Sequence, residues 1–466
     1  MSKNIAVILA GGEGKRMKSN KPKVLAEVLF KPMIDWVLAA AKASGVEETV
    51  LVVGHLGELV EEHAADRAKV VWQRERLGTG HAVMQALDIL KASDADNVLI
   101  LNGDAPFMDT DTILGSLHEH EADGNAVTVI SAEIAEPHGY GRILRAADGS
   151  LSAIVEEKDA SDDQRRIHEV NSGGLWFRRE DLIHALGQLT TGNEAHEYYL
   201  TDTIGILKAE GKRAGASATA NANVVLGAND RWQLHQLNEI ARMDILKKHM
   251  VNGVSIPCID GVIIGKDVEI GNETEILPGT ILRGKVTVGS NCVLGPNTQV
   301  NDSVIEDNVV LNNVECEESF IGEGCDLGPF THVRPNSRLT KNVHAGNFVE
   351  IKNAVIGEGT KVPHLTYVGD SDVGKGCNFG CGSLTVNYDG KIKHRTKIGD
   401  YVFVGCNTNL VAPVELGDFA YTAAGSTITE SVPAESMAIA RARQVNKEGW
   451  VSKKQPYKNK NPEKKD

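Results

Sequence analysis

The feature that most constrains the fold is a six-residue repeat of aliphatic side chains that begins near residue 264. Seven positions, each six residues from the last, carry Ile, Leu or Val: Ile264, Ile270, Ile276, Leu282, Val288, Leu294 and Val300. A second run keeps this step at Ile398, Val404, Leu410, Leu416 and Ile428, with Thr422 as the exception. A period of six matches neither a helix nor a flat strand. It predicts a β-solenoid in which each six-residue side turns one aliphatic side chain inward and each coil covers its neighbour.

The composition agrees with a solenoid. Only 5% of the residues are aromatic and 47 are glycines, as expected for a narrow core filled by aliphatic side chains with glycine-rich corners. A chain of 466 residues is nevertheless too long for one ordinary core, so two or more domains are expected.

The first half of the chain has a different pattern, in which short apolar runs alternate with segments of helical spacing. Strands are predicted at 4–10, 48–54 and 97–104, and helices at 33–44 and 79–93. Apolar strands joined by helices favour a parallel sheet covered on both faces. Because ligands of such sheets bind beyond the carboxyl ends of the strands, the glycine-rich segment 9–17 and Asp104 mark a candidate site.

Between the halves, helical spacing over residues 229–252 predicts one connecting helix, which Gly253 can end. The expected organisation is a nucleotide-binding domain at 1–228, a linker helix at 229–252, a solenoid at 253–450 and a disordered Lys-rich tail at 451–466.

Charge and cysteine content limit the function classes. A formal net charge of −14 makes binding of nucleic acid through a general positive field a poor hypothesis. The sequence contains no apolar run long enough to span a membrane and no signal peptide, so a cytoplasmic protein is expected. Its seven cysteines show no disulfide or zinc-ligand spacing.

The glycine-rich segment reads LAGGEGKRM from Leu9 to Met17 and indicates phosphate binding. A P-loop requires Ser or Thr after Gly14-Lys15, where this chain has Arg16. A dinucleotide fingerprint requires a third glycine where Met17 stands. What remains is a backbone that can approach an anion, with Arg16 and Lys23 as cations for phosphoryl or nucleotidyl transfer. Asp104 is a candidate ligand for Mg²⁺.

The solenoid carries polar residues that a plain coil does not need. Arg334, Lys352 and Lys393 are candidate phosphate ligands. Among them stands His364, whose imidazole titrates near neutral pH and could act as a base. An amine must lose a proton to attack a thioester, so this set suits acetyl transfer.

The motifs together resemble a known enzyme family. LAGGEGKRM with KPKVL resembles the signature of sugar-nucleotide pyrophosphorylases, and the further segments LGTGHA, NGD, GYGRI, IVEEKDA and VNSG narrow the match. Followed by hexapeptide repeats, the chain from about residue 4 to 450 is similar to the bifunctional bacterial N-acetylglucosamine-1-phosphate uridyltransferases/glucosamine-1-phosphate acetyltransferases. The resemblance implies a Rossmann-like mixed α/β sheet followed by a left-handed parallel β-helix that forms a homotrimer.

For the first half, the resemblance implies that UTP and N-acetylglucosamine 1-phosphate give UDP-N-acetylglucosamine and pyrophosphate. Arg16 and Lys23 would act on the triphosphate, and Asp104 and Asn229 would hold Mg²⁺. The residues implied to bind nucleotide or sugar are Leu9, Ala10, Gly11, Gly12, Lys23, Gln73, Gly78, Thr79, Gly141, Glu156, Asn171 and Asn229.

For the second half, the resemblance implies that His364 is the general base that activates glucosamine 1-phosphate toward acetyl-CoA. Arg334, Lys352, Tyr367 and Asn378 would bind the amino sugar phosphate. The residues implied to complete the site or bind acetyl-CoA are Asn387, Tyr388, Lys393, Cys406, Ala424 and Arg441.

Three positions depart from the usual family pattern. Gly11 stands in place of Ala, Lys15 in place of Thr, and Cys406 where Ser is frequent. Lys15 could add a phosphate contact, and Cys406 is interpreted as a packing variant. Two alternatives stay open: a single-function pyrophosphorylase whose solenoid serves only assembly, and a non-catalytic binding or regulatory trimer.

Overall fold

The computed structural model describes residues 2–193 and 196–456. The chain divides into two compact units, Met1–Lys247 and Lys248–Asp466. This division falls within helix α9 (Arg231–Val251), in the segment for which the sequence predicts a single helix.

The first unit is built on a mixed sheet whose main strand order is β11-β7-β10-β6-β1-β4-β5. β1 pairs in parallel with β4 and with β6, whereas β10 runs antiparallel to both β6 and β7. The mixed sheet implied by the resemblance is confirmed, and the antiparallel β10 distinguishes it from the purely parallel sheet that helix–strand alternation favours. The strands are β1 (Asn4–Ala10), β2 (Glu27–Val28), β3 (Lys31–Pro32), β4 (Glu48–Val53), β5 (Lys69–Trp72), β6 (Asn97–Asn102), β7 (Val127–Glu133), β8 (Arg142–Arg145), β9 (Leu151–Val155), β10 (Glu169–Arg178) and β11 (Ala214–Thr219).

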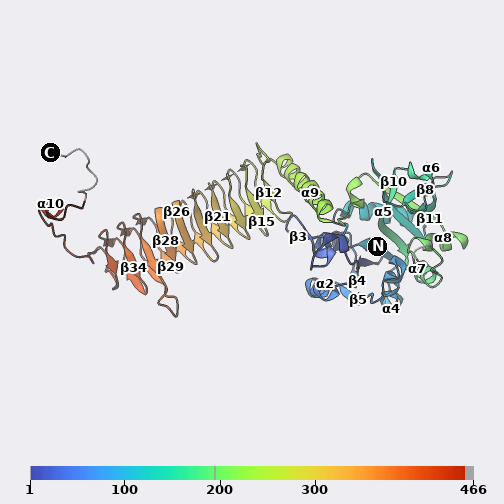
Figure 1. Cartoon of the computed structure of the whole chain (residues 1–466), viewed down its shortest axis with the longest axis horizontal. Helices are drawn as coiled ribbons and strands as arrows, with labels where there is room; N and C mark the ends of the chain where they lie inside the picture. The colour runs from blue at the N-terminus through green and yellow to red at the C-terminus, as the bar shows by residue number, and fades with distance from the viewer. Residues whose placement is uncertain (1, 194–195, 457–466) are drawn as a thin grey trace. The chain divides into compact units, whose positions relative to one another are not determined.

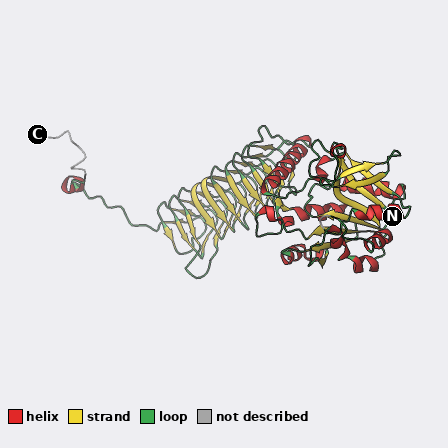
Figure 2. Ribbon diagram, turned by 45° about the vertical axis from the view of Figure 1, so that its right-hand side comes forward, coloured by secondary structure: helices red, strands yellow, loops and turns green. Residues whose placement is uncertain are grey.

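Helices cover both faces of this sheet (Figure 2), because successive side chains of each buried strand point to opposite faces. Ile5, Val7, Val98 and Ile100 pack on one face, in a cluster that includes α3, α4, α7 and α8. The alternate residues of the same strands pack in a second cluster with α1, α2 and α5. The helices are α1 (Met33–Ala43), α2 (Gly57–Ala64), α3 (Thr79–Met84), α4 (Leu87–Ala92), α5 (Thr110–Ala122), α6 (Asp162–Arg165), α7 (Arg179–Leu186) and α8 (Asp202–Ala209).

The expected helix at 79–93 is in fact two helices, α3 and α4. At the break, the backbone N–H groups of Gln85 and Ala86 donate to carbonyls three residues earlier instead of four. The side-chain amide of Gln85 donates to the carbonyl of His81 at 2.9 Å, the carbonyl that its own backbone N–H would use in an α-helix. Such competition by a polar side chain is not visible in the hydrophobic pattern.

The second unit is a parallel β-solenoid, confirmed by the register of its coils (Figure 1). Ile264 lies opposite Leu282, and Leu282 lies opposite Val300, so equivalent residues of successive coils are 18 positions, or three six-residue sides, apart. One face is a nine-stranded sheet of β13 (Glu269–Ile270), β16 (Thr287–Val288), β19 (Val304–Ile305), β22 (Phe320–Ile321), β25 (Arg338–Leu339), β27 (Val355–Ile356), β29 (Ser371–Val373), β32 (Thr396–Ile398) and β35 (Val414–Leu416).

The remaining strands form one continuous 18-stranded sheet, because β26 and β28 are each nine residues long and pair with strands on either side. These two strands carry Lys352, His364 and Tyr367, three of the polar residues singled out in the sequence. The sheet contains β12 (Ile263–Ile264), β14 (Glu275–Ile276), β15 (Ile281–Arg283), β17 (Val293–Leu294), β18 (Gln299–Asn301), β20 (Val310–Leu311), β21 (Val314–Glu317), β23 (Asp326–Leu327), β24 (Thr331–Arg334), β26 (His344–Lys352), β28 (Lys361–Gly369), β30 (Asn378–Phe379), β31 (Leu384–Val386), β33 (Phe403–Val404), β34 (Asn409–Val411), β36 (Tyr421–Thr422), β37 (Thr427–Ile428) and β38 (Met437–Ala438).

The six-residue repeat predicts the solenoid core well. Of its twelve aliphatic positions, Ile270 is half-buried and the others are buried. Thr422, the exception in the pattern, also points inward and is fully buried. Its hydroxyl accepts a hydrogen bond from the backbone N–H of Gly405 at 3.0 Å and lies 3.2 Å from the Thr408 hydroxyl. A buried hydroxyl with partners costs little, so threonine is accommodated there.

After the last coil, a short exposed helix, α10 (Trp450–Lys454), begins the Lys-rich tail. Disorder is predicted from residue 451, but residues 451–454 are helical instead. The part of this prediction from residue 457 onward lies outside the described residues. Among residues 2–193 and 196–456, no helix is long and apolar enough to cross a membrane.

Candidate functional sites in the two units

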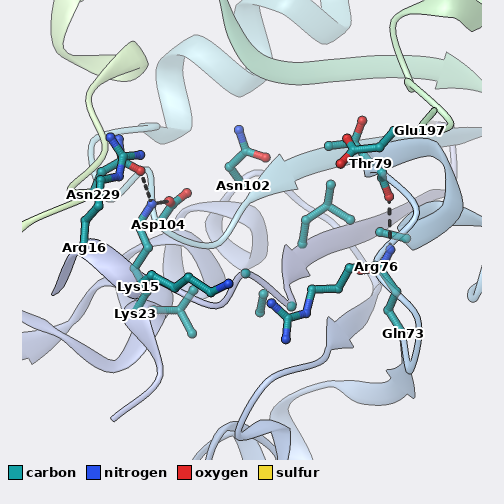
Figure 3. A pocket seen from close by; sticks show the side chains of 18 residues that line it. Lys15, Arg16, Lys23, Gln73, Arg76, Thr79, Asn102, Asp104, Glu197 and Asn229 are labelled. Carbon is teal, nitrogen blue, oxygen red and sulfur yellow. Dashed lines mark hydrogen bonds and ion pairs between the residues drawn. The ribbon is translucent and has the colours of Figure 1, made fainter. Parts of the chain in front are cut away.

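A cavity of about 450 Å³ lies at the carboxyl ends of β1 and β6 in the first unit. Figure 3 shows its polar side chains converging from the glycine-rich segment, from the loop after β5 and from Asn229, which precedes α9. It is lined by Leu9, Ala10, Gly11, Gly12, Gly14, Lys15, Arg16, Lys23, Val24, Gln73, Arg76, Gly78, Thr79, Ala82, Asn102, Asp104, Glu197 and Asn229. The sequence-predicted nucleotide residues Leu9, Ala10, Gly11, Gly12, Lys23, Gln73, Gly78, Thr79 and Asn229 are therefore brought together, with Arg16 and Asp104.

The glycine-rich segment takes its shape from one left-handed residue. Gly14 has φ +61°, and a Cβ built on it would lie 2.9 Å from the Cβ of Lys23. A side chain at position 14 would therefore be strained and would also push Lys23 away. Glycine at this position allows the segment to approach Lys23.

Lys23 occupies the centre of one end of the cavity. Its ammonium donates a hydrogen bond to Asn229 Oδ1 at 2.7 Å and forms an ion pair with Asp104. The side chains of Lys23 and Asp104 are only 13% and 26% exposed, so this pair is shielded from water.

The same donor set fits a magnesium ion. The oxygens of Asp104 and Asn229 both reach one cationic nitrogen, so they are close enough to share a small cation. A carboxylate and an amide oxygen are suitable ligands for Mg²⁺, which binds few protein groups and keeps several waters. No cluster of three or more His, Cys, Asp or Glu side chains suited to a metal occurs among the described residues. A magnesium site at Asp104 and Asn229 therefore stays a prediction, in which phosphate and water would supply the other ligands.

The opposite end of the cavity is built around Gln73, which is 7% exposed. Its side-chain amide donates to the carbonyl of Gly78 at 3.0 Å. A Cβ on Gly11 would lie 3.3 Å from Gln73 Oε1, so glycine in place of alanine leaves the amide more room. A buried amide beside exposed backbone groups can recognise the donors and acceptors of a base edge.

A second cavity, of about 470 Å³, adjoins the first and shares Leu9, Thr79 and Asn102 with it. Gly173 leaves room for Asn102 at this shared wall, because its φ is +80° and a Cβ built on it would lie only 2.1 Å from Asn102 Nδ2. The cavity also includes Gly139, Glu156, Glu157, Lys158, Asp159, Asn171, Gly173, Leu175, Tyr199, Leu200 and Thr201.

Of the three residues expected to bind the sugar, Glu156 and Asn171 line this second cavity, whereas Gly141 does not line it but lies next to both of them. The backbone N–H of Asn171 donates to the carbonyl of Gly141 at 2.9 Å, and a Cβ on Gly141 would lie 3.3 Å from Glu156 Oε1. Enclosure by the cavity wall raises the pKa of Glu156, and the neighbouring carboxylates of Asp159 and Asp202 raise it further. Carboxylate and amide groups in one wall suit the hydroxyl and acetamido groups of a sugar.

In the second unit, the predicted phosphate ligands form a cationic cluster. Arg334 on β24 and Lys352 on β26 are paired in register on neighbouring coils. The amine of Lys393 lies within hydrogen-bonding range of Lys352 and lowers the pKa of Lys352, with a further contribution from Arg334. Glu350 accepts a hydrogen bond from Arg334 at 2.8 Å. Three cations beside one carboxylate form a site for an anion.

Tyr367 and Asn387 join this cluster from the following coils. The side-chain amide of Asn387 donates to the Tyr367 hydroxyl at 3.3 Å and also to Asp370, which is 5% exposed. Tyr388 and Lys393 form a bridge that closes the loop after Asn387. The loop thereby holds Lys393 beside Lys352.

His364 lies on β28, exposed, beyond a corner of the coil. Leu365, which follows it, has φ +44°, and this bend places His364 and Tyr367 on the outer surface on either side of buried Thr366. No hydrogen bond joins the His364 imidazole to the cationic cluster in the described part of the chain. Asn378 pairs with Lys361 at the start of β28. Asn378 is therefore next to the part of β28 that precedes His364, whereas the cationic cluster is next to the part that follows it.

The residues expected to bind acetyl-CoA at the far end lie in one column of successive coils. The backbone N–H of Gly425, next to Ala424, donates to the carbonyl of Cys406 at 2.8 Å. A Cβ on Gly425 would lie 3.8 Å from Cδ of Arg441. Cys406 is exposed. A row of residues from Cys406 to Arg441 suits an elongated ligand that carries a phosphate group at one end.

Several residues in these sites were not predicted. Asn102 could have been found, because it precedes Gly103-Asp104 at the end of a predicted strand. Glu350 could also have been found, because alternation in a strand places it on the same face as Lys352. Arg76, Glu197 and Asp370 come from loops or turns with no motif, and only the structure shows their positions.

Comparison with known proteins agrees with both halves. Residues 6–170 match the MobA-like NTP transferase domain, and residues 267–302 match six repeats of the bacterial transferase hexapeptide. The chain is 50% identical over 450 residues to the bifunctional protein GlmU of Acetivibrio thermocellus, with 97% of each chain covered. It is 49% identical over 454 residues to that of Caldanaerobacter subterraneus, covering 97% of this chain and 99% of the relative. It is 48% identical to that of Clostridium acetobutylicum, with 96% and 98% covered. With both units matched at this level over almost the whole length, the chain belongs to the GlmU family of bifunctional proteins.

Proposed function

We propose that each unit carries one active site, with uridyl transfer in residues 1–228, acetyl transfer in residues 253–450 and the segment 229–252 as the connection. As a GlmU family member, the protein is an acetyltransferase and a uridyltransferase, and it produces UDP-N-acetylglucosamine. The acetyl site converts glucosamine 1-phosphate and acetyl-CoA to N-acetylglucosamine 1-phosphate. The uridyl site then joins that product to UMP from UTP.

The observation that carries the uridyl site is the pair of adjoining cavities in the first unit. One has Gln73 at one end and the cations Arg16 and Lys23 at the other, and the second groups Glu156 with Asn171. A nucleoside triphosphate in the first and a sugar phosphate in the second would meet at the shared wall formed by Leu9, Thr79 and Asn102. Transfer between two bound substrates requires such adjoining sites.

In uridyl transfer, a phosphate oxygen of N-acetylglucosamine 1-phosphate attacks the α-phosphorus of UTP. The new P–O bond forms as the bond from the α-phosphorus to the bridging oxygen breaks, and pyrophosphate leaves with the electron pair. Arg16 and Lys23 neutralise charge on the triphosphate and on the leaving group. Asp104 and Asn229 would hold Mg²⁺, which supplies further charge neutralisation when bound.

In acetyl transfer, the cationic cluster of Arg334, Lys352 and Lys393 binds the phosphate of glucosamine 1-phosphate. Tyr367, Asn378 and Asn387 orient the sugar. His364 takes a proton from the amino group as its nitrogen attacks the thioester carbonyl. The C–S bond then breaks, and coenzyme A leaves as a thiolate that takes the proton held by His364. Tyr388, Cys406, Ala424 and Arg441 lie along the cofactor.

We further propose that the coils are left-handed and that the protein is a homotrimer through the solenoid, so that a neighbouring subunit completes the acetyl site. Exposure of His364 and of the column at Cys406 in a single chain supports this proposal. The substrates are small molecules, acetyl-CoA and UTP among them, and we place the reactions in the cytoplasm.

One assay tests the whole assignment. The protein is supplied with glucosamine 1-phosphate, acetyl-CoA, UTP and Mg²⁺, and UDP-N-acetylglucosamine is measured while each component is omitted in turn. We expect free coenzyme A without UTP, but no pyrophosphate without acetyl-CoA unless N-acetylglucosamine 1-phosphate is added. Pyrophosphate release without any acetyl transfer would support the single-function pyrophosphorylase. Absence of both activities would support a non-catalytic binding trimer.

A further inference from the structure

The nucleotide cavity contains two cations for which the reaction as described has no task. Lys15 follows Gly14 in the glycine-rich segment, and Arg76 belongs to the loop between β5 and α3. Both line the cavity. Figure 3 shows their side chains extending from opposite sides toward the same space in the middle of the cavity.

A single carboxylate connects these two cations. Glu13 lies 3.2 Å from the ammonium of Lys15 and forms an ion pair with the guanidinium of Arg76. The hydrogen bond from Arg76 lowers the pKa of Glu13, and the one from Lys15 lowers it further. Glu13 is not among the residues that line the cavity, so it acts on the cavity through Lys15 and Arg76.

The balance of charge among Glu13, Lys15 and Arg76 leaves the two cations available for a ligand. Lys23 is already paired with Asp104, whereas one carboxylate cannot neutralise both Lys15 and Arg76. The three side chains therefore carry a net charge of +1 where the cavity is open. A nucleoside triphosphate carries most of its charge on the phosphates beyond the α-phosphate, and pyrophosphate gains charge as it leaves.

We propose that Glu13 is a positioning residue that holds Lys15 and Arg76 toward the cavity, where these two cations bind the polyphosphate tail of UTP and the pyrophosphate that leaves. This inference rests on the proposed uridyl transfer. It assigns a role to Lys15, which stands where the family usually has threonine, and to Arg76, which no motif marks. Without the carboxylate, two long and exposed cationic side chains would repel each other and sample many rotamers.

The opposite role for Glu13 makes the opposite prediction. A carboxylate that merely competed with the phosphates for Lys15 and Arg76 would weaken UTP binding, and its removal would strengthen it. The sign of the change in Glu13→Gln therefore decides between the two roles, because glutamine keeps the shape of the side chain and removes only its charge.

The test measures binding of UTP, UMP and inorganic pyrophosphate by titration calorimetry, at fixed Mg²⁺, with the full-length protein. We expect Glu13→Gln to raise the Kd of UTP and of pyrophosphate about three- to tenfold, as expected for loss of two partly exposed charge pairs. The Kd of UMP, which has no tail, should not change. Lys15→Thr and Arg76→Gln should each weaken UTP about five- to twentyfold, again without an effect on UMP.

The control is Glu75→Gln, in the loop that carries Arg76. Glu75 is exposed, and this substitution removes the same charge while keeping the shape of the side chain. It should bind UTP as the unsubstituted protein does. In the double variant Lys15→Thr/Arg76→Gln, adding Glu13→Gln should cause no further loss, because Glu13 acts only through those two residues. An unchanged KM for N-acetylglucosamine 1-phosphate shows that the unit is folded in each variant.

Three results would overturn the inference: UTP binding that is unchanged or tighter in Glu13→Gln, equal weakening of UTP and UMP, or a further loss when Glu13→Gln is added to the double variant. Failure of the proposed function is a separate outcome. It would appear as absence of pyrophosphate release by the unsubstituted protein, which is measured first.

Discussion

The solenoid core offers a sharp test, because two valines four residues apart differ almost only in burial. Val300 is 1% exposed and lies between Leu282 and Cys316 of the neighbouring coils. Val304 is 42% exposed. Both can be changed to alanine with the same loss of two methyl groups, so any difference in stability reports the core.

The expected magnitude follows from burial. Two buried methyl groups at about 0.8 kcal/mol each give about 1.6 kcal/mol of lost transfer free energy. A residual space of about 50 Å³ adds about 1 kcal/mol at roughly 24 cal/mol per Å³. Val300→Ala should therefore lower the free energy of unfolding of the solenoid by about 2–3 kcal/mol, and Val304→Ala by less than about 0.5 kcal/mol.

Urea unfolding, followed with two probes, measures this effect. Acetyl transfer reports the solenoid, whereas tryptophan fluorescence mainly reports the first unit, which holds four of the five tryptophans. With a slope of roughly 2 kcal/mol per M, the solenoid midpoint of Val300→Ala should fall by about 1 M. All variants are compared at one protein concentration, because the proposed assembly would make stability depend on it.

Two outcomes would refute this reasoning. A Val300→Ala shift no larger than that of Val304→Ala would show that the six-residue repeat does not define the core. An equal shift in the fluorescence midpoint would show that the two units do not unfold as separate bodies, contrary to their separation into two compact units.

Three further predictions concern the sites and the first unit. His364→Ala should lower acetyl transfer by about 10²- to 10⁴-fold and leave uridyl transfer intact in separate assays; loss of both in a folded protein would contradict the division. Lys23→Ala, or chelation of Mg²⁺, should lower uridyl transfer by about 10²-fold or more with acetyl transfer unchanged, and equal loss in both assays would show a general defect. Burial of His120 on α5 lowers its pKa to about 4, so between about pH 6.5 and 4 the unfolded state binds the extra proton. The first unit should lose on the order of 3 kcal/mol of stability as pH falls through this window. Tryptophan fluorescence in urea measures this loss, and His120→Gln should make the stability less dependent on pH. The same pH profile in both proteins would refute the prediction.

The sequence could predict the elements whose cause is a repeated local pattern. The inward side chains of the solenoid were predicted because each coil repeats one burial requirement, and even Thr422 follows it with its hydroxyl paired inside. β1, β4 and β6 were predicted because short, continuous apolar runs are typical of strands buried on both faces. The break between α3 and α4 was missed because it arises from the Gln85 side chain, which bonds the carbonyl of His81.

The site residues likewise divide into those that the sequence predicts and those that only the structure brings together. Lys23 and Asp104 were predicted through motifs and Asn229 through the family resemblance, and the structure places the oxygens of Asp104 and Asn229 around the Lys23 ammonium group. Glu13 and Arg76 could not be paired in advance, because their loops are 63 residues apart and meet only after the sheet has formed. The magnesium site, the trimer and the roles of the individual residues stay predictions that the proposed experiments test.

The position of Lys23 also bears on how metal and nucleotide bind together. Its ammonium contacts both Asp104 and Asn229, the two groups proposed to hold Mg²⁺, so a metal ion bound there would have to displace it. A phosphate group gives the displaced ammonium a new partner, and Mg²⁺ alone does not. Metal and UTP should therefore bind with positive cooperativity, each raising the affinity for the other by the same factor. We therefore expect the protein to bind the metal–nucleotide complex more tightly than either component alone.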